Sequence, residues 1–177
     1  KQLDLLNFSL NAFRTTKALN VNSLDIVLTE KCSLKCENCS NLMQYYEKPI
    51  DNDLDTILKA LKNFFDNIDY CFEIRLIGGE PLLFKKIDVV INYLLKQNKF
   101  DRIIIYTNGT IIPKGERINI FKNKKIKFSI SNYGKISRNV EGLEKKLNEN
   151  GIDFISERVT KWQDCAVIKK FDRPESL

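Results

Sequence analysis

The amino-acid sequence predicts an α/β fold built on a parallel sheet. Short apolar runs rich in β-branched residues alternate with amphipathic segments, which is typical of βαβ units with right-handed crossovers. Four of the apolar runs end in loops rich in cysteine, glycine, asparagine or serine. With 177 residues, of which 43% are hydrophobic and 29% charged, the chain has the size and composition of one globular domain.

The expected elements follow one another along the chain. Strands are expected at 23–32, 71–81, 102–110, 126–134 and 152–159. Helices are expected at 1–20, 51–65, 85–98 and 139–151. The helix at 51–65 starts with an aspartate suited to capping, and its apolar stripe is Leu54, Ile57, Leu58, Leu61 and Phe65.

This order divides the chain into three parts. They are an N-terminal helical extension (1–22), a core domain (23–160) and the start of a C-terminal segment (161–177). The apolar run 164–171 is all that remains for a sixth strand, and no crossover helix of about ten residues fits before it. The core is therefore either a short, open barrel or a fragment of a longer protein.

The charge and hydropathy of the chain indicate which partners and which cellular compartment to expect. Lysine and arginine number 29 against 23 aspartates and glutamates, but no dense basic block with interleaved aromatics occurs, so a nucleic-acid partner is not favoured. No apolar run reaches the roughly 20 residues of a membrane span, and the charged opening segment is unlike a signal peptide. We therefore expect a cytoplasmic protein without membrane contact.

Three of the five cysteines, Cys32, Cys36 and Cys39, are crowded into one loop, and histidine is absent. Structural zinc usually takes four protein ligands, whereas iron–sulfur clusters take closely spaced cysteine sulfurs. The loop therefore indicates a 4Fe–4S cluster with one iron left open for a substrate or cofactor. Cys71 and Cys165 are expected in the core, with a hydrogen donor or a ligand to a second cluster as the alternative for Cys165.

Ligands of parallel α/β sheets bind at the loops after the carboxyl ends of the strands. The cysteine loop, Gly-Gly-Glu-Pro at 78–81, Thr-Asn-Gly-Thr at 107–110 and the segment 129–134 all fall at that end. The C-x3-C-x2-C spacing followed by Gly-Gly-Glu-Pro resembles the radical S-adenosylmethionine (radical SAM) superfamily over 23–159. The resemblance implies a partial (βα)6-type barrel of parallel strands, incomplete at its C-terminal end.

The resemblance also implies a reaction. Cys32, Cys36 and Cys39 would ligate three irons of the cluster, and S-adenosylmethionine would chelate the fourth. Reductive cleavage of its sulfonium would give a 5'-deoxyadenosyl radical that abstracts hydrogen from a substrate. The implied partners are a reductant such as flavodoxin or ferredoxin and a peptide or protein, sugar or nucleotide substrate, with the mild positive charge favouring an anionic one such as a nucleotide-linked sugar. No catalytic residue is assigned.

Eight residues are expected to bind the cofactor: Gly78, Gly79, Glu80, Thr107, Asn108, Ser129, Ser131 and Asn38. The resemblance places the glycines and Glu80 beside the methionine amino group, and the two serines share one face of their strand. Simpler interpretations stay open, because these segments also form turns and serines fill small spaces. Tyr133 and Arg158 also fall at strand ends.

Asn38 departs from the superfamily pattern, in which an aromatic residue precedes the third cysteine and packs near the adenine. The adenine would then pack on Leu34, Tyr45 or Tyr46, or meet a polar contact at Asn38.

Two alternatives use the same residues. A non-catalytic metal-binding or redox module would complete the cysteine loop with Cys71, Cys165 or a carboxylate, and an inactive fold would serve as a docking subunit. Neither requires Gly-Gly-Glu-Pro after the second strand, so this motif favours the enzyme.

Overall fold

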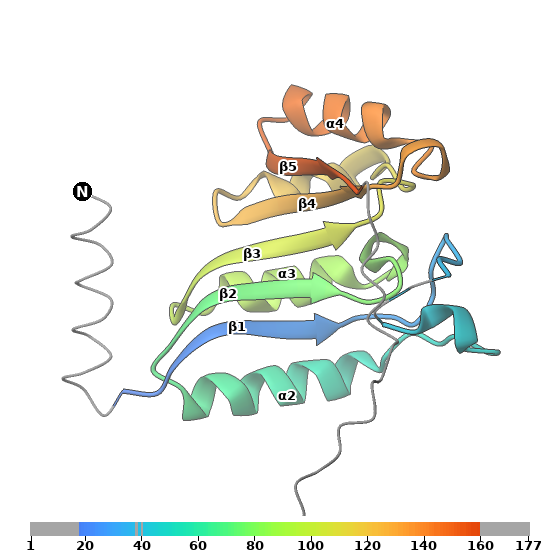
Figure 1. Ribbon diagram of the computed structural model, residues 1–177. Coiled ribbons are helices and arrows are strands. Elements are labelled where there is room, and N and C mark those ends of the chain that lie inside the picture. The colour runs from blue at the N-terminus through green and yellow to red at the C-terminus, as the bar shows by residue number, and fades with distance from the viewer. Residues whose placement is uncertain (1–17, 38, 40, 160–177) are drawn as a thin grey trace, which may run out of the picture.

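The computed structural model describes residues 18–37, 39 and 41–159. Within them, five strands form one parallel sheet in the order in which they occur along the chain. The strands are β1 (Asn20–Val27), β2 (Tyr70–Ile77), β3 (Phe100–Thr107), β4 (Ile126–Asn132) and β5 (Asp153–Arg158). This arrangement confirms the predicted α/β fold with parallel strands (Figure 1).

Helical segments connect the strands. The α-helices are α2 (Leu54–Asn67), α3 (Ile87–Leu95) and α4 (Val140–Glu149), which follow β1, β2 and β4 as predicted. Between β3 and β4 the connection is instead a 3-10 segment, η3 (Gly115–Lys122), where the sequence predicted no helix. Three shorter 3-10 turns lie in the loops after β1, β2 and β4: η1 (Met43–Tyr45), η2 (Pro81–Leu83) and η4 (Gly134–Ile136).

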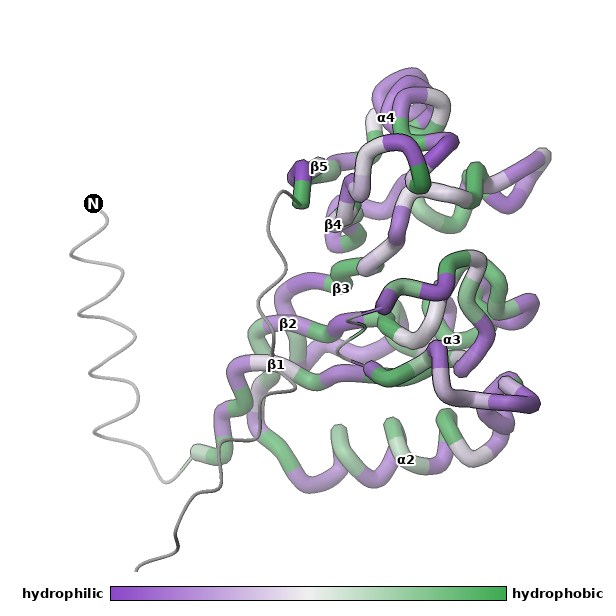
Figure 2. The backbone as a smooth tube through the Cα atoms, turned by 45° about the vertical axis from the view of Figure 1, so that its right-hand side comes forward, coloured by the Kyte–Doolittle hydropathy of each residue, from purple (hydrophilic) through white to green (hydrophobic). Residues whose placement is uncertain are grey.

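The α2 helix illustrates how the sequence forms these elements. Asp53 precedes the helix, and its carboxylate accepts a hydrogen bond of 2.9 Å from the Thr56 amide. The segment predicted from the sequence instead begins with Asp51, two residues earlier, so a different aspartate caps the helix. Hydrophobic and hydrophilic residues alternate along α2 (Figure 2), and Ile57, Leu61 and Phe65 are buried. The helix therefore contributes one apolar stripe to the core.

The sheet has one covered face and one open face. Ile74 of β2 and Ile103 of β3 are fully buried in a single hydrophobic core together with residues of all three α-helices. In Figure 1, α3 lies behind β2 and β3. Because side chains alternate along a strand, Arg75 and Tyr106 point to the opposite face, where they are partly exposed. This open face carries the cavity described below.

The predicted boundary between the N-terminal extension and the core domain differs from the one in the structure. β1 begins at Asn20, so the last three residues of the predicted extension, 1–22, belong to the sheet, because Asn20 pairs with Tyr70 of β2. Residues 1–17 and the predicted segment 161–177, including Cys165, lie outside the described residues.

Cys71 is completely buried at the start of β2, as expected. No helix in the described part of the chain has the length and apolar character needed to cross a membrane.

Candidate functional site

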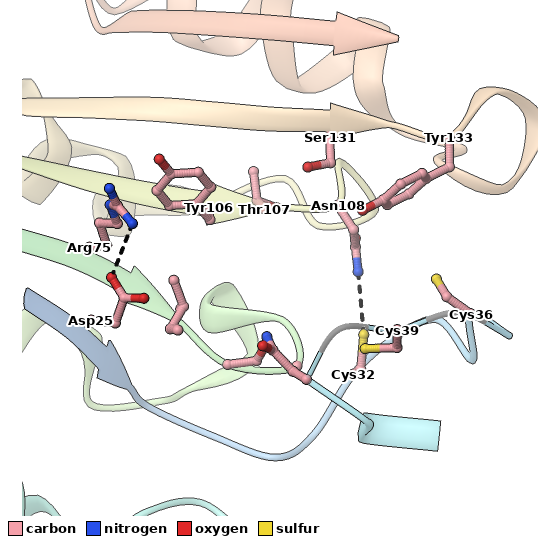
Figure 3. A pocket seen from close by; sticks show the side chains of 14 residues that line it. Asp25, Cys32, Cys36, Cys39, Arg75, Tyr106, Thr107, Asn108, Ser131 and Tyr133 are labelled. Atoms are coloured by element: carbon pink, nitrogen blue, oxygen red, sulfur yellow. Dashed lines mark hydrogen bonds and ion pairs between the residues drawn. The ribbon is translucent and has the colours of Figure 1, made fainter. Parts of the chain in front are cut away.

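A cavity of about 330 Å³ lies at the carboxyl ends of the strands. It brings together residues from β1 to β4 and the loops that follow them (Figure 3). The lining residues are Asp25, Cys32, Cys36, Cys39, Asn41, Arg75, Ile77, Gly78, Gly79, Tyr106, Thr107, Asn108, Ser131 and Tyr133. All three cysteines of the predicted cluster loop are therefore on its wall.

Main-chain hydrogen bonds hold the cysteine loop against the glycines that follow β2. The amide of Gly79 donates to the Thr29 carbonyl at 2.8 Å, and the amide of Glu80 donates to the Lys31 carbonyl at 2.8 Å. Gly78 has a φ of 155°, and a Cβ added to Gly79 would lie 2.3 Å from the Lys31 carbonyl oxygen. The glycines thus allow a close approach, and the group that approaches in this structure is the backbone of the cysteine loop.

A polar contact that no sequence motif predicts anchors the start of this loop. The Thr29 hydroxyl is fully buried and donates to Asp51 Oδ1 at 2.7 Å, while the Lys31 ammonium lies 2.8 Å from Asp51 Oδ2. The hydrogen bond from Lys31 lowers the pKa of the Asp51 carboxyl below its usual value. Asp51 therefore ties the segment before α2 to the base of the cysteine loop.

The three thiols are free and partly buried. Burial raises the pKa values of the Cys32 and Cys36 thiols, so ligation would have to displace their protons. Among the described residues, no three cysteine, histidine or acidic side chains are arranged to hold a single metal ion. The three thiols line one cavity, and closely spaced cysteine sulfurs are the ligands that iron–sulfur clusters take.

Asn108, which follows β3, connects its own loop to the first cysteine. Its amide Nδ2 donates to Cys32 Sγ at 3.5 Å and to Ser33 Oγ at 3.1 Å. Its Oδ1 accepts from the Thr110 amide at 3.0 Å, which fixes the orientation of the side-chain amide. The predicted residue Asn108 therefore lies in the site and directs an N–H donor at a candidate ligand sulfur.

Glu80 takes a different position from the one expected beside a cofactor ammonium. Its side chain is completely buried and is not part of the cavity wall. The carboxylate accepts hydrogen bonds from the Thr107 hydroxyl at 2.9 Å, the Asn108 amide at 2.9 Å and the Leu82 amide at 3.1 Å. Burial outweighs these hydrogen bonds and raises the pKa of Glu80 to about 7. Glu80 thus joins the loops after β2 and β3, and Thr107 directs its hydroxyl at Glu80.

The two predicted serines of β4 differ in their position relative to the cavity. Ser131 lines the cavity beside Tyr133, whereas Ser129, two residues earlier on the same face, does not. Tyr133 is hydrogen-bonded to Ser131, and burial raises the pKa of its phenol. Arg158 is exposed at the end of β5 and does not line the cavity.

Among the described residues, none of the side chains predicted to pack against the adenine lines the cavity, and the aromatic lining residues are Tyr106 and Tyr133. Asn38 lies outside the described residues. Leu34, Tyr45 and Tyr46 do not line the cavity, and Tyr45 is 73% exposed.

Five lining residues belong to none of the motifs that the sequence offers: Asp25, Asn41, Arg75, Ile77 and Tyr106. Four of them lie inside strands, where alternation alone could have placed them on the open face but could not show which face is open. Asn41 donates to the Gly78 carbonyl at 3.1 Å and so braces the glycine loop.

Comparison with known proteins assigns these features to a family. The family model described as "Radical SAM superfamily" matches residues 26–134. The GTP 3',8-cyclase of Clostridium acetobutylicum is 29% identical over 147 residues, covering 74% of this chain and 45% of that protein. The enzyme of the same name from Helicobacter pylori strain HPAG1 is 26% identical over 142 residues, covering 72% and 43%. The chain thus spans less than half the length of these relatives.

Solved structures share the fold. Streptococcus suis SuiB bound to S-adenosylmethionine superimposes with a TM-score of 0.64 at 23% identity, covering 81% of this chain and 35% of that one. The structure of anSMEcpe with bound AdoMet and Cp18Cys peptide gives a TM-score of 0.61 at 18% identity, covering 77% and 42%. The cysteine loop, the glycine loop that supports it and the matching family model together show that this chain belongs to the radical SAM superfamily.

Proposed function

We propose that this chain is the cofactor-binding part of a radical SAM enzyme that cleaves S-adenosylmethionine reductively and abstracts hydrogen from a substrate. The observation that carries the proposal is that Cys32, Cys36 and Cys39 open into the same cavity as Gly78 and Gly79. Thiolates are the ligands that iron–sulfur clusters take, and three of them leave one iron for a cofactor. When bound, the cluster and S-adenosylmethionine supply one-electron cleavage to a 5'-deoxyadenosyl radical.

The chain's own residues would bind and orient these groups. The three cysteines would hold the cluster as thiolates, and Asn108 would keep its N–H donor on Cys32 Sγ. The hydroxyl groups of Ser131 and Tyr133 border the cavity and offer hydrogen bonds to a ribose or a carboxylate. Ile77 and the ring of Tyr106 add apolar surface that limits the access of water.

A zinc-binding module is the weaker alternative. It would need four ligands around one ion, and the described residues contain no such group. It would also leave unexplained why Gly79 must accommodate the Lys31 carbonyl so closely. For the enzyme, the partners would be a reductant such as flavodoxin or ferredoxin and a peptide, sugar or nucleotide substrate.

The test is anaerobic reconstitution with iron and sulfide, followed by reduction in the presence of S-adenosylmethionine. We expect broad absorbance of an iron–sulfur cluster and formation of 5'-deoxyadenosine and methionine. A variant with Cys32, Cys36 and Cys39 all replaced by alanine should lose both signals. Cys71→Ala is the matched control, since Cys71 is buried away from the cavity. Equal 5'-deoxyadenosine yields from wild type and the triple variant would refute the proposal.

Asn108 should raise the reduction potential of the cluster, because an N–H donor at a ligand sulfur stabilises the extra negative charge of the reduced state. Asn108→Asp keeps the acceptor for Thr110 but replaces the donor with a carboxylate. We expect its potential to fall by roughly tens of millivolts. A redox titration followed by electron paramagnetic resonance measures it, with Asn92→Ala on the exposed side of α3 as control. An unchanged potential would contradict the role of Asn108.

A further inference from the structure

At the end of the cavity away from the cysteines, Asp25 and Arg75 line the wall, and Glu73 and Arg102 lie next to them on the open sheet face. Asp25 and Arg75 face each other across β1 and β2, and Glu73 and Arg102 face each other across β2 and β3. Figure 3 shows Asp25 and Arg75 beside Tyr106, at the opposite end of the cavity from the thiols. We refer to Asp25, Glu73, Arg75 and Arg102 as the charged floor.

The charges of this floor are matched within the protein. Arg75 Nε lies 2.7 Å from Glu73 Oε1, and Arg75 Nη1 lies 3.5 Å from Asp25 Oδ1. Arg102 Nε lies 3.2 Å from Glu73 Oε2. Although burial acts in the opposite direction, hydrogen bonds from the two arginines lower the pKa of Glu73. Two cations and two anions therefore balance one another.

The neighbouring charges of the open face give no positive surplus either. On the next strands, Lys127 lies 3.4 Å from Asp153, so this pair is also matched. Glu157 of β5 pairs in register with Ser131 and adds a carboxylate near the cavity mouth. Among the described residues that line the cavity, Asp25 and Arg75 are the charged side chains.

This balance determines what kind of group can enter. Sites for polyphosphates carry surplus lysine or arginine, or a helix N-terminus directed at the phosphates. Here a triphosphate would be repelled by the carboxylate of Asp25, whose side chain is 49% exposed, and would have to compete with two carboxylates for Arg75. A neutral group meets no such cost, since Asp25 accepts hydrogen bonds while Arg75 and the phenol of Tyr106 donate them.

We propose that the charged floor receives an electrically neutral substrate group with adjacent hydrogen-bond donors and acceptors, such as the hydroxyls of a sugar ring, and excludes polyphosphates. This inference rests on the proposed function, because it assigns the substrate end of the same cavity. It sets the chain apart from the relatives named GTP 3',8-cyclase, whose named substrate carries a triphosphate.

The test measures binding of guanosine and of GTP, each carrying the same fluorescent group, by anisotropy. The reconstituted wild-type chain should bind the nucleoside at least as tightly as the triphosphate, and absence of saturable GTP binding counts as the same result. Asp25→Arg makes the floor positive and should tighten GTP binding at least about tenfold. The matched control is Asp66→Arg, the same charge change on the exposed surface of α2. It should leave GTP binding as in wild type, and circular dichroism checks the fold of each variant.

Two outcomes would overturn the inference. The first is saturable GTP binding by wild type that Arg75→Gln weakens, because the floor would then bind phosphate. The second is a folded Asp25→Arg variant that binds GTP no better than Asp66→Arg does. Neither outcome touches 5'-deoxyadenosine formation. Loss of that reaction in the wild type would refute the proposed function, while the binding ratio would still report on the floor.

Discussion

Replacing Gly79 by alanine is expected to abolish cluster assembly and to destabilise the fold by about 3 kcal/mol. A Cβ at this position would lie 2.3 Å from the Lys31 carbonyl oxygen and 2.9 Å from Cys32 Cβ. These neighbours cannot move independently, because the Lys31 carbonyl accepts the Glu80 amide at 2.8 Å. The methyl group must therefore displace the cysteine loop itself, and with it the first ligand.

Two measurements check this expectation: chemical denaturation for the free energy of unfolding, and iron content after anaerobic reconstitution for the cluster. Gly115→Ala is the matched control, since an added Cβ there has nothing within 4 Å. Its positive φ of 54° should cost only about 1 to 2 kcal/mol and leave the iron content unchanged. A Gly79→Ala variant that holds the same amount of iron as Gly115→Ala would show that the loop tolerates displacement.

The second large effect is expected at Glu80. Replacement by alanine leaves the Thr107 hydroxyl and the amides of Asn108 and Leu82 without their buried acceptor, and it opens a cavity. We expect a loss of about 3 to 5 kcal/mol in the free energy of unfolding. Glu80→Gln should lose about 1 to 3 kcal/mol, because its amide N–H₂ would face one of the backbone donors. Thermal and urea denaturation measure the free energy of unfolding of both variants. If Glu80→Ala lost less of it than Glu80→Gln, the hydrogen-bond role of Glu80 would be contradicted.

Glu80 also predicts a pH dependence. Its pKa is raised from 4.5 to about 7 in the folded protein, so the folded state favours the protonated carboxyl. The associated stabilisation is fully present below pH 4.5 and is lost as the pH rises towards 7, by about 3 kcal/mol in total. Other carboxyls titrate with the opposite sign, so the quantity to follow is the difference in unfolding free energy between wild type and Glu80→Gln. This difference should fall from pH 4.5 to pH 7, and a constant difference would exclude titration of Glu80.

Much of the fold and part of the site could be predicted from local patterns. Alternating apolar runs and helical stripes report secondary structure directly, because each element must bury one face. The clustering of Cys32, Cys36 and Cys39 with Gly78 and Gly79 followed from the rule that parallel strands end at one edge. The η3 segment escaped prediction because its residues lack a helical stripe. Packing of Ile118 and Phe121 into the core and a hydrogen bond from Arg117 to the Phe84 carbonyl hold it in place.

The direction of individual side chains could not be predicted in the same way. The motif of Glu80 stands beside the site and so predicted a cofactor contact, but in the structure its carboxylate accepts hydrogen bonds from the Thr107 hydroxyl. Ser129 and Ser131 share a face by alternation, yet only the cavity's position along β4 separates them. Asp25 and Arg75 are distant in sequence, and the register of β1 on β2 makes them a pair.

By itself, the sequence determined the α/β class, the parallel strands and the three thiols at one edge, because these depend on local periodicity and on short-range spacing. Only the tertiary structure determined which groups lie around those thiols and contact them. The Asn108 donor at Cys32, the buried Glu80 linkage and the balanced charges of the floor arise from strand register and loop contacts between residues far apart in the chain. Such contacts have no local signature, since they depend on the packing of the whole sheet.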